Sequence, residues 1–385
     1  MLEEVERWLA RRSWSVADRP RQQLAAAKRA TGATVSVVLP ALDEEETVGE
    51  IVAVIRRELM GGAGEPAEGG AQRPAPSGRP APSVRTGPEG GPAAGAPSAP
   101  APSRATATGS MASGSVPGAG AEEEADERVR LVDELVVIDS GSTDRTAEVA
   151  AAAGARVVHR DAILPRIPAL PGKGEVLWRS LLVTSGDIVC FVDADLRQFS
   201  ADFVAGIVGP LLTEPDVHLV KAMYDRPLGG QPGQGGRVTE LMARPLLNLH
   251  WPRLAGFVQP LGGEYAARRS LLEQLPFPVG YGVELGLLVD ALHTVGLDAL
   301  AQVDVGVRRH RHQDGRALGR MAAAIYRTAQ LRLARGRLGP PALVRPVLTQ
   351  FERTEEGFEP RSYEVDTEER PPMTKIAEYA RRRVA

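Results

Sequence analysis

The sequence predicts an α/β fold with a mostly parallel central sheet that carries helices on both faces. Short apolar runs alternate with helical stretches, as in parallel strands joined by crossover helices. The three clearest runs are residues 35–39, 134–138 and 187–192. Because these runs are apolar at consecutive positions rather than at every second one, both faces of these strands are expected to be buried.

Each expected element follows from apolar spacing and from the residues at its ends. Helices are expected at residues 2–12, 20–30, 47–59, 145–153, 173–184, 238–249, 282–295 and 317–334. Strands are expected at residues 35–39, 134–138, 155–158, 187–192 and 299–307. Pro40 is expected to end the first strand, because proline supplies no backbone N–H to a sheet.

A block rich in Gly and Pro interrupts this pattern. Of residues 61–120, 46 of 60 are Gly, Pro, Ala or Ser, and none is Phe, Trp, Tyr, Leu or Ile. Such a block cannot bury enough apolar surface to offset the entropy of chain ordering. We therefore expect residues 61–127 to be a disordered insertion. Residues 1–32 are expected to pack on the core as helices, and residues 316–385 to form a long helix and a peripheral tail.

Composition excludes several classes of protein. The chain has 46 Lys and Arg against 49 Asp and Glu, a net charge of -3, which gives no electrostatic reason to expect nucleic acid. Cys190 is the single cysteine, so an internal disulfide framework is excluded and a reducing compartment is favoured. No run is long and apolar enough for a membrane span, and the acidic N-terminus is unlike a signal peptide. The expected location is cytoplasmic.

Acidic and hydroxyl-bearing loops follow three of the expected strands. Asp193-Ala194-Asp195 follows the third apolar run, and strand residues two apart point to the same side. Paired carboxylates suit a hard divalent cation that also binds phosphate oxygens, although loop carboxylates that cap the next helix are the alternative. Pro40-Ala-Leu-Asp-Glu44 and Asp139-Ser-Gly-Ser-Thr-Asp144 follow the other two strands and are expected at the same sheet edge.

Three later features have both a functional and a structural interpretation. His310 and His312 lie two apart in an Arg-rich stretch, so either is a candidate ligand or a solvated surface residue. The Gly-rich residues 229–236 lead to Arg237 at a helix start, which favours an anion, although a linker with a solvated Arg is the alternative. Glu284 is either a pocket carboxylate or a first-turn residue favoured by the helix dipole.

Taken together, these motifs resemble one enzyme family. Pro171-Gly-Lys-Gly174, Gly235-Gly-Arg-Val-Thr-Glu240, Gln259-Pro-Leu-Gly-Gly-Glu-Tyr265, Gly280-Tyr-Gly-Val-Glu284 and Arg308-Arg-His-Arg-His312 are similar to the glucosyl-3-phosphoglycerate synthases of actinobacteria. The resemblance implies a retaining glycosyltransferase of GT-A fold. Its catalytic domain would comprise residues 33–60 and 128–315, with a nucleotide-sugar half to about residue 200 and an acceptor half after it.

The resemblance also implies roles for individual residues. The nucleotide-sugar pocket would be lined by Pro40, Ala41, Leu42, Glu44, Ser140, Lys173, Asp193, Ala194, Tyr281 and Arg308. The acceptor would be bound by Gly236, Arg237, Thr239 and His312, and the metal by Asp195 and His310. Glu284, Asp195 and Arg237 would be the catalytic residues. The family usually has Asn where this chain has Asp43, so we expect Asp43 to stabilise a turn. His312 stands where family members can carry Asn.

The implied reaction is transfer of glucose from UDP-glucose to the 2-hydroxyl of 3-phosphoglycerate, with Mg²⁺ or Mn²⁺ as cofactor. GDP-glucose as donor, mannosyl transfer from GDP-mannose and transfer to a lipid phosphate are the enzymatic alternatives. A nucleotide-sugar binding protein without catalysis is the alternative from another class. The resemblance also implies a homodimer, for which the helix at residues 317–334 is a candidate interface, although its apolar face could equally cover the sheet.

Overall fold

The computed structural model describes residues 1–61, 129–227, 235–309, 314–335, 346–355, 357–365 and 368–384. The predicted insertion at 61–127 lies outside these residues except for Gly61. The central sheet has eight strands in the order β1-β9-β6-β7-β5-β2-β3-β4. Its strands are β1 (Ser13–Ser15), β2 (Val35–Ala41), β3 (Glu134–Asp139), β4 (Arg156–His159), β5 (Ile188–Phe191), β6 (Leu219–Asp225), β7 (Tyr265–Arg268) and β9 (Leu300–Val307).

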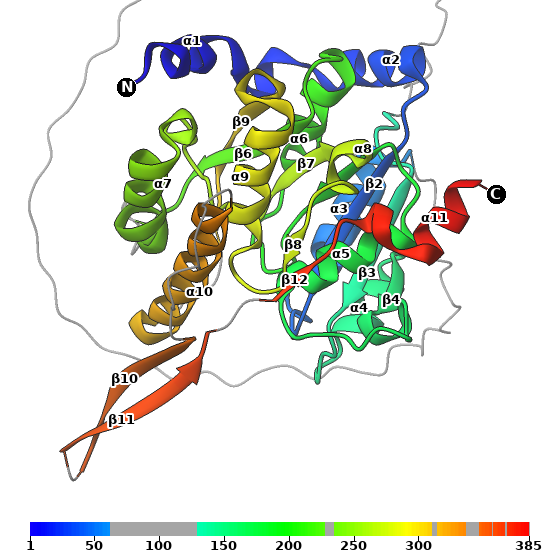
Figure 1. Ribbon diagram of the computed structural model, residues 1–385. Helices are drawn as coiled ribbons and strands as arrows, with labels where there is room; N and C mark the ends of the chain where they lie inside the picture. The colour runs from blue at the N-terminus through cyan, green and yellow to red at the C-terminus, as the bar shows by residue number, and fades with distance from the viewer. Residues whose placement is uncertain are drawn as a thin grey trace, which may run out of the picture. The chain divides into compact units, whose positions relative to one another are not determined.

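The sheet is mostly parallel, as the sequence predicts. Only β7 runs antiparallel to its two neighbours, β5 and β6. Helices cover both faces (Figure 1). They are α1 (Glu3–Arg12), α2 (Arg21–Thr31), α3 (Val48–Leu59), α4 (Thr146–Ala152), α5 (Lys173–Val183), α6 (Asp202–Thr213), α7 (Arg244–His250), α8 (Arg269–Leu272), α9 (Val283–Val295), α10 (Gly315–Ala334) and α11 (Ala377–Val384).

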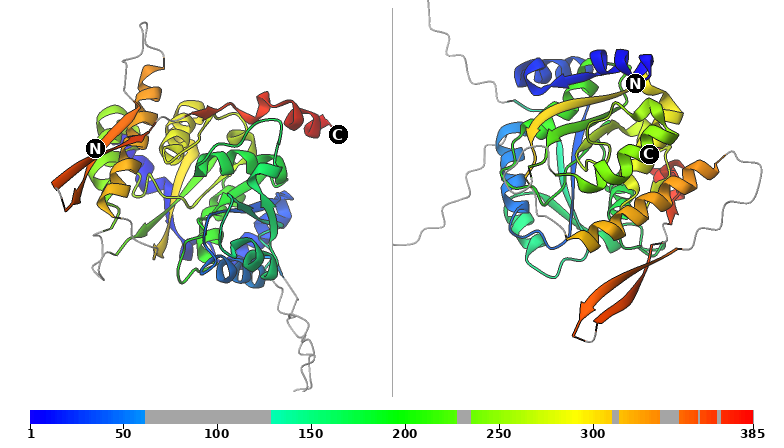
Figure 2. Two further views of the ribbon diagram at one scale, coloured as in Figure 1. Left: turned by 90° about the horizontal axis from the view of Figure 1, so that it is seen from below. Right: turned by 90° about the vertical axis from the view of Figure 1, so that its left-hand side faces the viewer.

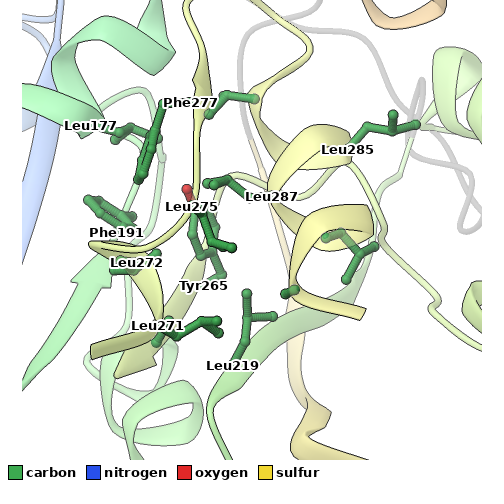
Figure 3. Packing of buried hydrophobic residues seen from close by; sticks show 14 of the residues in the cluster. Leu177, Phe191, Leu219, Tyr265, Leu271, Leu272, Leu275, Phe277, Leu285 and Leu287 are labelled. Carbon is green, nitrogen blue, oxygen red and sulfur yellow. The ribbon is translucent and has the colours of Figure 1, made fainter. Parts of the chain in front are cut away.

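Alternate residues of the central strands enter two separate cores. Val37 and Cys190 pack with α3 and α6 on one face, whereas Val38 and Phe191 pack with α5 and α9 on the other. Figure 3 shows the second core, where the rings of Phe191 and Tyr265 lie 5.0 Å apart between centroids. Strands buried on both faces explain the uninterrupted apolar runs in the sequence.

The prediction that Pro40 ends the first strand is wrong, because β2 continues to Ala41. Pro40 pairs with Ile138 of β3, while the pairing of β2 with β5 ends at Val38. At Pro40, strand β2 therefore pairs with β3 but no longer with β5. The missing N–H of Pro40 on the β5 side costs no hydrogen bond between strands.

The helix expected at residues 238–249 contains an irregular turn. Residues Thr239–Ala243 form a π-helical segment, and α7 begins only at Arg244. Pro245 occupies the first turn of α7, where a missing N–H is tolerated. A single π turn before this proline accommodates the break in the hydrogen-bond ladder.

The C-terminal region is not simply peripheral. β10 (Val347–Thr354) and β11 (Gly357–Glu364) form a hairpin that projects from the rest of the described chain (Figure 1). In contrast, β12 (Glu369–Arg370) pairs with β8 (Phe277–Pro278). Met373, Ile376 and Tyr379 are buried in the core beside α5. The expectation of a peripheral tail therefore fails for the segment that follows the hairpin.

The N-terminal helices pack on the sheet region as expected. α1 and α2 follow one another along one side of the domain (Figure 2, right). Between them, β1 pairs with β9 at the sheet edge, and α2 packs against α6. Among the described residues, no helix has the length and apolar character needed to cross a membrane.

Candidate active site

A cavity of about 810 Å³ opens beyond the carboxyl ends of β2, β3 and β5. It brings together almost every site residue predicted from the sequence. They are Pro40, Ala41, Leu42, Glu44, Ser140, Lys173, Asp193, Ala194, Asp195, Gly236, Arg237, Thr239, Tyr281, Glu284 and Arg308. His310 and His312 lie outside the described residues, so their predicted roles stay predictions.

Asp43 connects the loops after β2 and β3 rather than lining the cavity. Its backbone is in the left-handed region, with φ of 55°. Its carboxylate accepts the backbone N–H of Thr143 at 2.7 Å, and its own N–H donates to the Ser142 hydroxyl at 3.1 Å. Asp tolerates this conformation better than most residues. Asp43 therefore joins two loops, and its predicted role in stabilising a turn stays a prediction.

Lys173 holds two carboxylates at the centre of the cavity. It is the first residue of α5, and its ammonium is ion-paired with Asp193 and lies 2.8 Å from Glu284. Burial raises the pKa of Asp193, but the charges of Lys173 and Arg308 outweigh burial and lower that pKa. Asp193 is therefore an ionised carboxylate at neutral pH.

Gly263 makes the close approach of these groups possible. A Cβ atom built at Gly263 would overlap the carboxylate of Asp193 and the ammonium of Lys173. Lys221, buried on β6, donates to the carbonyl of the preceding residue Gly262 at 2.7 Å. A side chain at 263 would therefore displace Asp193 and Lys173 from their present positions, and Lys221 holds the backbone beside Gly263.

Arg308 links the two carboxylates of the Asp193-Ala-Asp195 motif. Its Nη2 lies 2.9 Å from Asp193 and 3.1 Å from Asp195. Its Nε donates at 2.7 Å to Glu264, which is fully buried. The hydroxyl of Tyr224 donates to the other oxygen of Glu264 at 2.7 Å. Glu264 and Tyr224 therefore fix the orientation of Arg308.

The carboxylate of Asp195 fits a divalent cation. Burial raises the pKa of Asp195, and the nearby charges of Asp193 and Glu264 raise it further against the opposing charge of Arg308. An added cation would offset this excess of negative charge. Within the described part of the chain, no group of three or more His, Cys, Asp or Glu side chains is arranged for a metal ion. The arrangement suits a cation that takes further oxygen ligands from a bound phosphate.

The segment from Gly235 to Thr239 forms another side of the cavity. Gly236 has φ of 76°, which favours glycine, and it precedes Arg237 at the start of the helical segment. The N–H of Gly235 donates to the carbonyl of Arg226 at 2.7 Å. A cationic side chain and the N–H groups of a helix start form a suitable environment for an anion.

The structure also places residues in the site that sequence reasoning missed. The cavity wall includes Arg160, Arg226 and three apolar residues of α10, namely Leu318, Met321 and Ile325. The apolar face of α10 packs on α9 and faces the cavity, so it is used within this chain. Glu264 belongs to the motif at residues 259–265, although its role was not predicted. Nothing in the sequence marks Arg226 as a site residue except its position before the Gly-rich residues.

Three comparisons show which known proteins this chain is similar to. The family model described as "Glycosyl transferase family 2" matches residues 127–275. Glucosyl-3-phosphoglycerate synthase of Mycolicibacterium smegmatis is 43% identical over 379 residues, covering 96% of this chain and 98% of the relative.

Two solved structures are also similar over most of their length. Mannosyl-3-phosphoglycerate synthase from Rubrobacter xylanophilus has a TM-score of 0.73 at 35% identity, covering 97% of this chain and 98% of that chain. Glucosyl-3-phosphoglycerate synthase from Mycobacterium tuberculosis, solved with Mn²⁺, uridine diphosphate and phosphoglyceric acid, has a TM-score of 0.67 at 38% identity. That comparison covers 92% of this chain and 95% of the solved one.

Proposed function

Because the chain belongs to the glucosyl-3-phosphoglycerate synthase family, we propose that it transfers glucose from UDP-glucose to the 2-hydroxyl of 3-phosphoglycerate with retention at the anomeric carbon. The observation that supports this most is the single cavity that joins the carboxylates after β5 to the Gly235–Thr239 segment. The first group suits a nucleotide diphosphate with its cation, and the second suits an anionic acceptor.

The donor is bound by the loops at the carboxyl ends of β2 and β3. Pro40, Ala41, Leu42 and Ser140 line the part of the cavity assigned to uridine. Asp193 faces the ribose or sugar, and Glu284 orients the sugar through its hydroxyl groups. Since Lys173 bonds both carboxylates, they are held in fixed positions before the donor arrives.

A divalent cation, Mg²⁺ or Mn²⁺, would be held by Asp195 and His310. When bound, it supplies Lewis-acid stabilisation of the departing diphosphate. Arg308 lies beside Asp195 and adds positive charge at the same place. Asp195 and Arg308 thus orient the phosphates and keep the negative charge of the leaving group close to fixed cations.

The acceptor attacks the anomeric carbon on the same face of the sugar from which the diphosphate departs. The 2-hydroxyl oxygen of the acceptor bonds to the anomeric carbon as the bond from that carbon to the phosphate oxygen breaks. The hydroxyl proton passes to an oxygen of the departing diphosphate. Asp193 and Glu284 are both ion-paired with Lys173, which disfavours either as a covalent nucleophile below the ring. Arg237, Gly236 and Thr239 position the acceptor.

Mannosyl transfer from GDP-mannose is the second candidate, favoured by the structural similarity to the Rubrobacter xylanophilus enzyme. A donor and acceptor matrix distinguishes the two. Purified protein with Mg²⁺ or Mn²⁺ is incubated with UDP-glucose, GDP-glucose or GDP-mannose, each with and without 3-phosphoglycerate. We expect acceptor-dependent release of UDP and an α-linked glucosyl product by NMR. Faster turnover with GDP-mannose would establish the second candidate, and donor binding without turnover would indicate a binding protein.

We also propose a homodimer in the cytoplasm. Phe351 and Phe358 of the β10–β11 hairpin are 63% and 66% exposed, and such side chains suit an interface between copies. The buried free thiol of Cys190 suits a reducing compartment. Sedimentation velocity tests the dimer, and a monomer at micromolar concentration would contradict it.

A further inference from the structure

Arg226 is a second guanidinium on the acceptor side of the cavity. It follows β6 directly and lines the cavity together with Arg237. The hydrogen bond from Gly235 N–H to the Arg226 carbonyl brings the start of the Gly235–Thr239 segment against it. A side chain at Gly236 would come within 3.9 Å of the Cδ atom of Arg226. Arg226 and Arg237 therefore border the same space.

The side chain of Arg226 is held in place by an aromatic residue. Its Nη2 donates to the hydroxyl of Tyr224 at 2.9 Å, and its guanidinium carbon lies 5.2 Å from the centroid of the Tyr224 ring. Tyr224 is itself fixed by its hydrogen bond to buried Glu264. The guanidinium is thus oriented before any ligand binds, which reduces the entropy lost on binding.

Arg226 also retains unused hydrogen-bonding capacity. Its Nε is buried and has no hydrogen-bond partner among the described residues. A buried donor without a partner is costly, and a guanidinium offers five N–H donors in a planar fork. The flat, two-oxygen geometry of a carboxylate matches this fork.

The chemistry of the acceptor requires more than one cation. 3-Phosphoglycerate carries a phosphate at one end and a carboxylate next to the reacting 2-hydroxyl. Arg226 is connected through Tyr224 and Glu264 to Arg308, which contacts Asp193. These contacts link Arg226 to the groups proposed to hold the donor, whereas Arg237 stands at a helix start suited to phosphate.

We propose that Arg226 binds the carboxylate of the acceptor and so places the adjacent hydroxyl at the donor sugar, with Tyr224 and Glu264 as positioning residues. This inference rests on the proposed function, because it assumes an acceptor with both a carboxylate and a phosphate. In this proposal Arg226 binds the carboxylate of the acceptor and Arg237 binds its phosphate.

Two fragments of the acceptor test this division. Glycerate keeps the carboxylate and lacks the phosphate, whereas glycerol 3-phosphate keeps the phosphate and lacks the carboxylate. Each is measured as a competitive inhibitor against 3-phosphoglycerate in wild type, Arg226→Met and Arg237→Met. We expect Arg226→Met to raise the KM for 3-phosphoglycerate and the inhibition constant of glycerate about tenfold or more, with that of glycerol 3-phosphate changed less than about twofold. Arg237→Met should show the opposite selectivity.

Further variants separate binding from folding. Arg226→Lys keeps the charge without the fork and should lie between wild type and Arg226→Met. Tyr224→Phe should change glycerate inhibition in the same direction as Arg226→Met, by a smaller factor. Equal weakening of both fragments in Arg226→Met, or weakening of glycerol 3-phosphate alone, would overturn the assignment. A wild-type protein that does not use 3-phosphoglycerate would instead refute the proposed function itself.

Discussion

The ammonium of Lys173 lies 2.8 Å from the carboxylate of Glu284, so the first turn of α5 is bonded to the first turn of α9. The sequence predicts that α5 belongs to a nucleotide-sugar half of the chain and α9 to an acceptor half. The same ammonium pairs with Asp193. One cation therefore sets the spacing of two carboxylates around the position assigned to the sugar.

Replacement of this cation should damage catalysis more than folding. In Lys173→Met, two carboxylates lose their shared partner, and their repulsion moves them from their positions. We expect kcat to fall about a hundredfold, as for loss of a fixed charge in an active site. Steady-state UDP release measures this, with exposed Lys375→Met as the matched control. A Lys173→Met variant with wild-type kcat would remove Lys173 from the site.

Asp195 should determine the dependence on metal. We expect chelation to abolish wild-type activity and added Mg²⁺ or Mn²⁺ to restore it. Asp195→Asn loses the charged oxygen that a hard cation prefers, so kcat/KM should fall by about a thousandfold and saturation should require more metal. UDP release titrated with Mn²⁺ measures both effects. If Asp195→Asn kept the activity of the wild type at the metal concentration that the wild type requires, Asp195 would not be a metal ligand.

Stability should depend on pH through Lys221. Burial, the largest cause, lowers the pKa of Lys221 to about 8, despite the nearby carboxylates of Glu284 and Glu264. Above that pH the folded protein releases the proton while the unfolded chain keeps it up to its usual pKa near 10.5. The unfolded state then binds more protons, so stability rises with pH in this range.

The comparison of wild type with Lys221→Met isolates this effect. From pH 8 to 10.5, wild type should gain roughly 3 kcal/mol relative to the variant, from the pKa difference between the two states. Urea denaturation at several pH values measures the difference. A constant difference across this range would mean that Lys221 keeps an ordinary pKa in the folded protein.

An interior ion cluster should anchor α10 to the domain. Arg332 of α10 lies 2.7 Å from Asp290 of α9, and both side chains are at most 5% exposed. Arg335 lies 2.5 Å from Asp290 and 3.0 Å from Glu369 of β12. In Asp290→Asn the buried guanidinium of Arg332 keeps Glu369 but loses its other carboxylate partner. This loss should cost about 3 kcal/mol in the free energy of unfolding.

Chemical denaturation of Asp290→Asn measures this cost, with Asp298→Asn as control. Asp298 pairs with Arg11 on the surface and is 72% exposed, so the control should cost less than about 1 kcal/mol. Because α10 contributes Leu318 and Met321 to the cavity, the KM for the acceptor should rise in Asp290→Asn alone. Similar losses in both variants would rule out an anchoring role.

Residues 62–128 should be dispensable for activity. Met60 and Arg130 form an antiparallel bridge, and the N–H groups of Leu131 and Val132 donate to the carbonyl of Leu59. The described residues that flank the segment are thus bonded to each other at the end of α3, away from the carboxyl ends of β2 and β3. Replacement by a short Gly-Ser linker should leave kcat/KM within about twofold. Loss of activity in a folded deletion variant would contradict this.

The parts of the fold that the sequence predicts are those with local signals. Residues 35–39 and 134–138 are apolar at every position except Ser36 and Glu134, because both faces of β2 and β3 are buried. The sequence of β6 is not a continuous apolar run, because Lys221 and Asp225 interrupt it, and β6 was therefore not predicted. β7 spans only four residues, too few for a reliable pattern.

The site was predictable where a motif is contiguous and not where it depends on tertiary contacts. Asp193, Asp195 and Lys173 belong to short motifs at strand and helix ends. Glu264 meets Tyr224 and Arg308 only in the folded chain, across 40 and 44 positions of sequence. The buried Met373 was hidden because it lies in a charged, Pro-rich stretch that suggests an exposed tail.

The hydrogen bonds from Arg226 through Tyr224 and Glu264 to Arg308 join the proposed acceptor side of the cavity to its proposed donor side. A ligand that draws Arg308 toward phosphate would move Arg308 away from Glu264. The hydrogen bonds of Glu264 to Tyr224, and of Tyr224 to Arg226, would then change as well. The two substrates are therefore expected to bind with a coupling free energy. Thermodynamic linkage makes that coupling reciprocal, so the donor must change the affinity for the acceptor by the same factor as the acceptor changes the affinity for the donor.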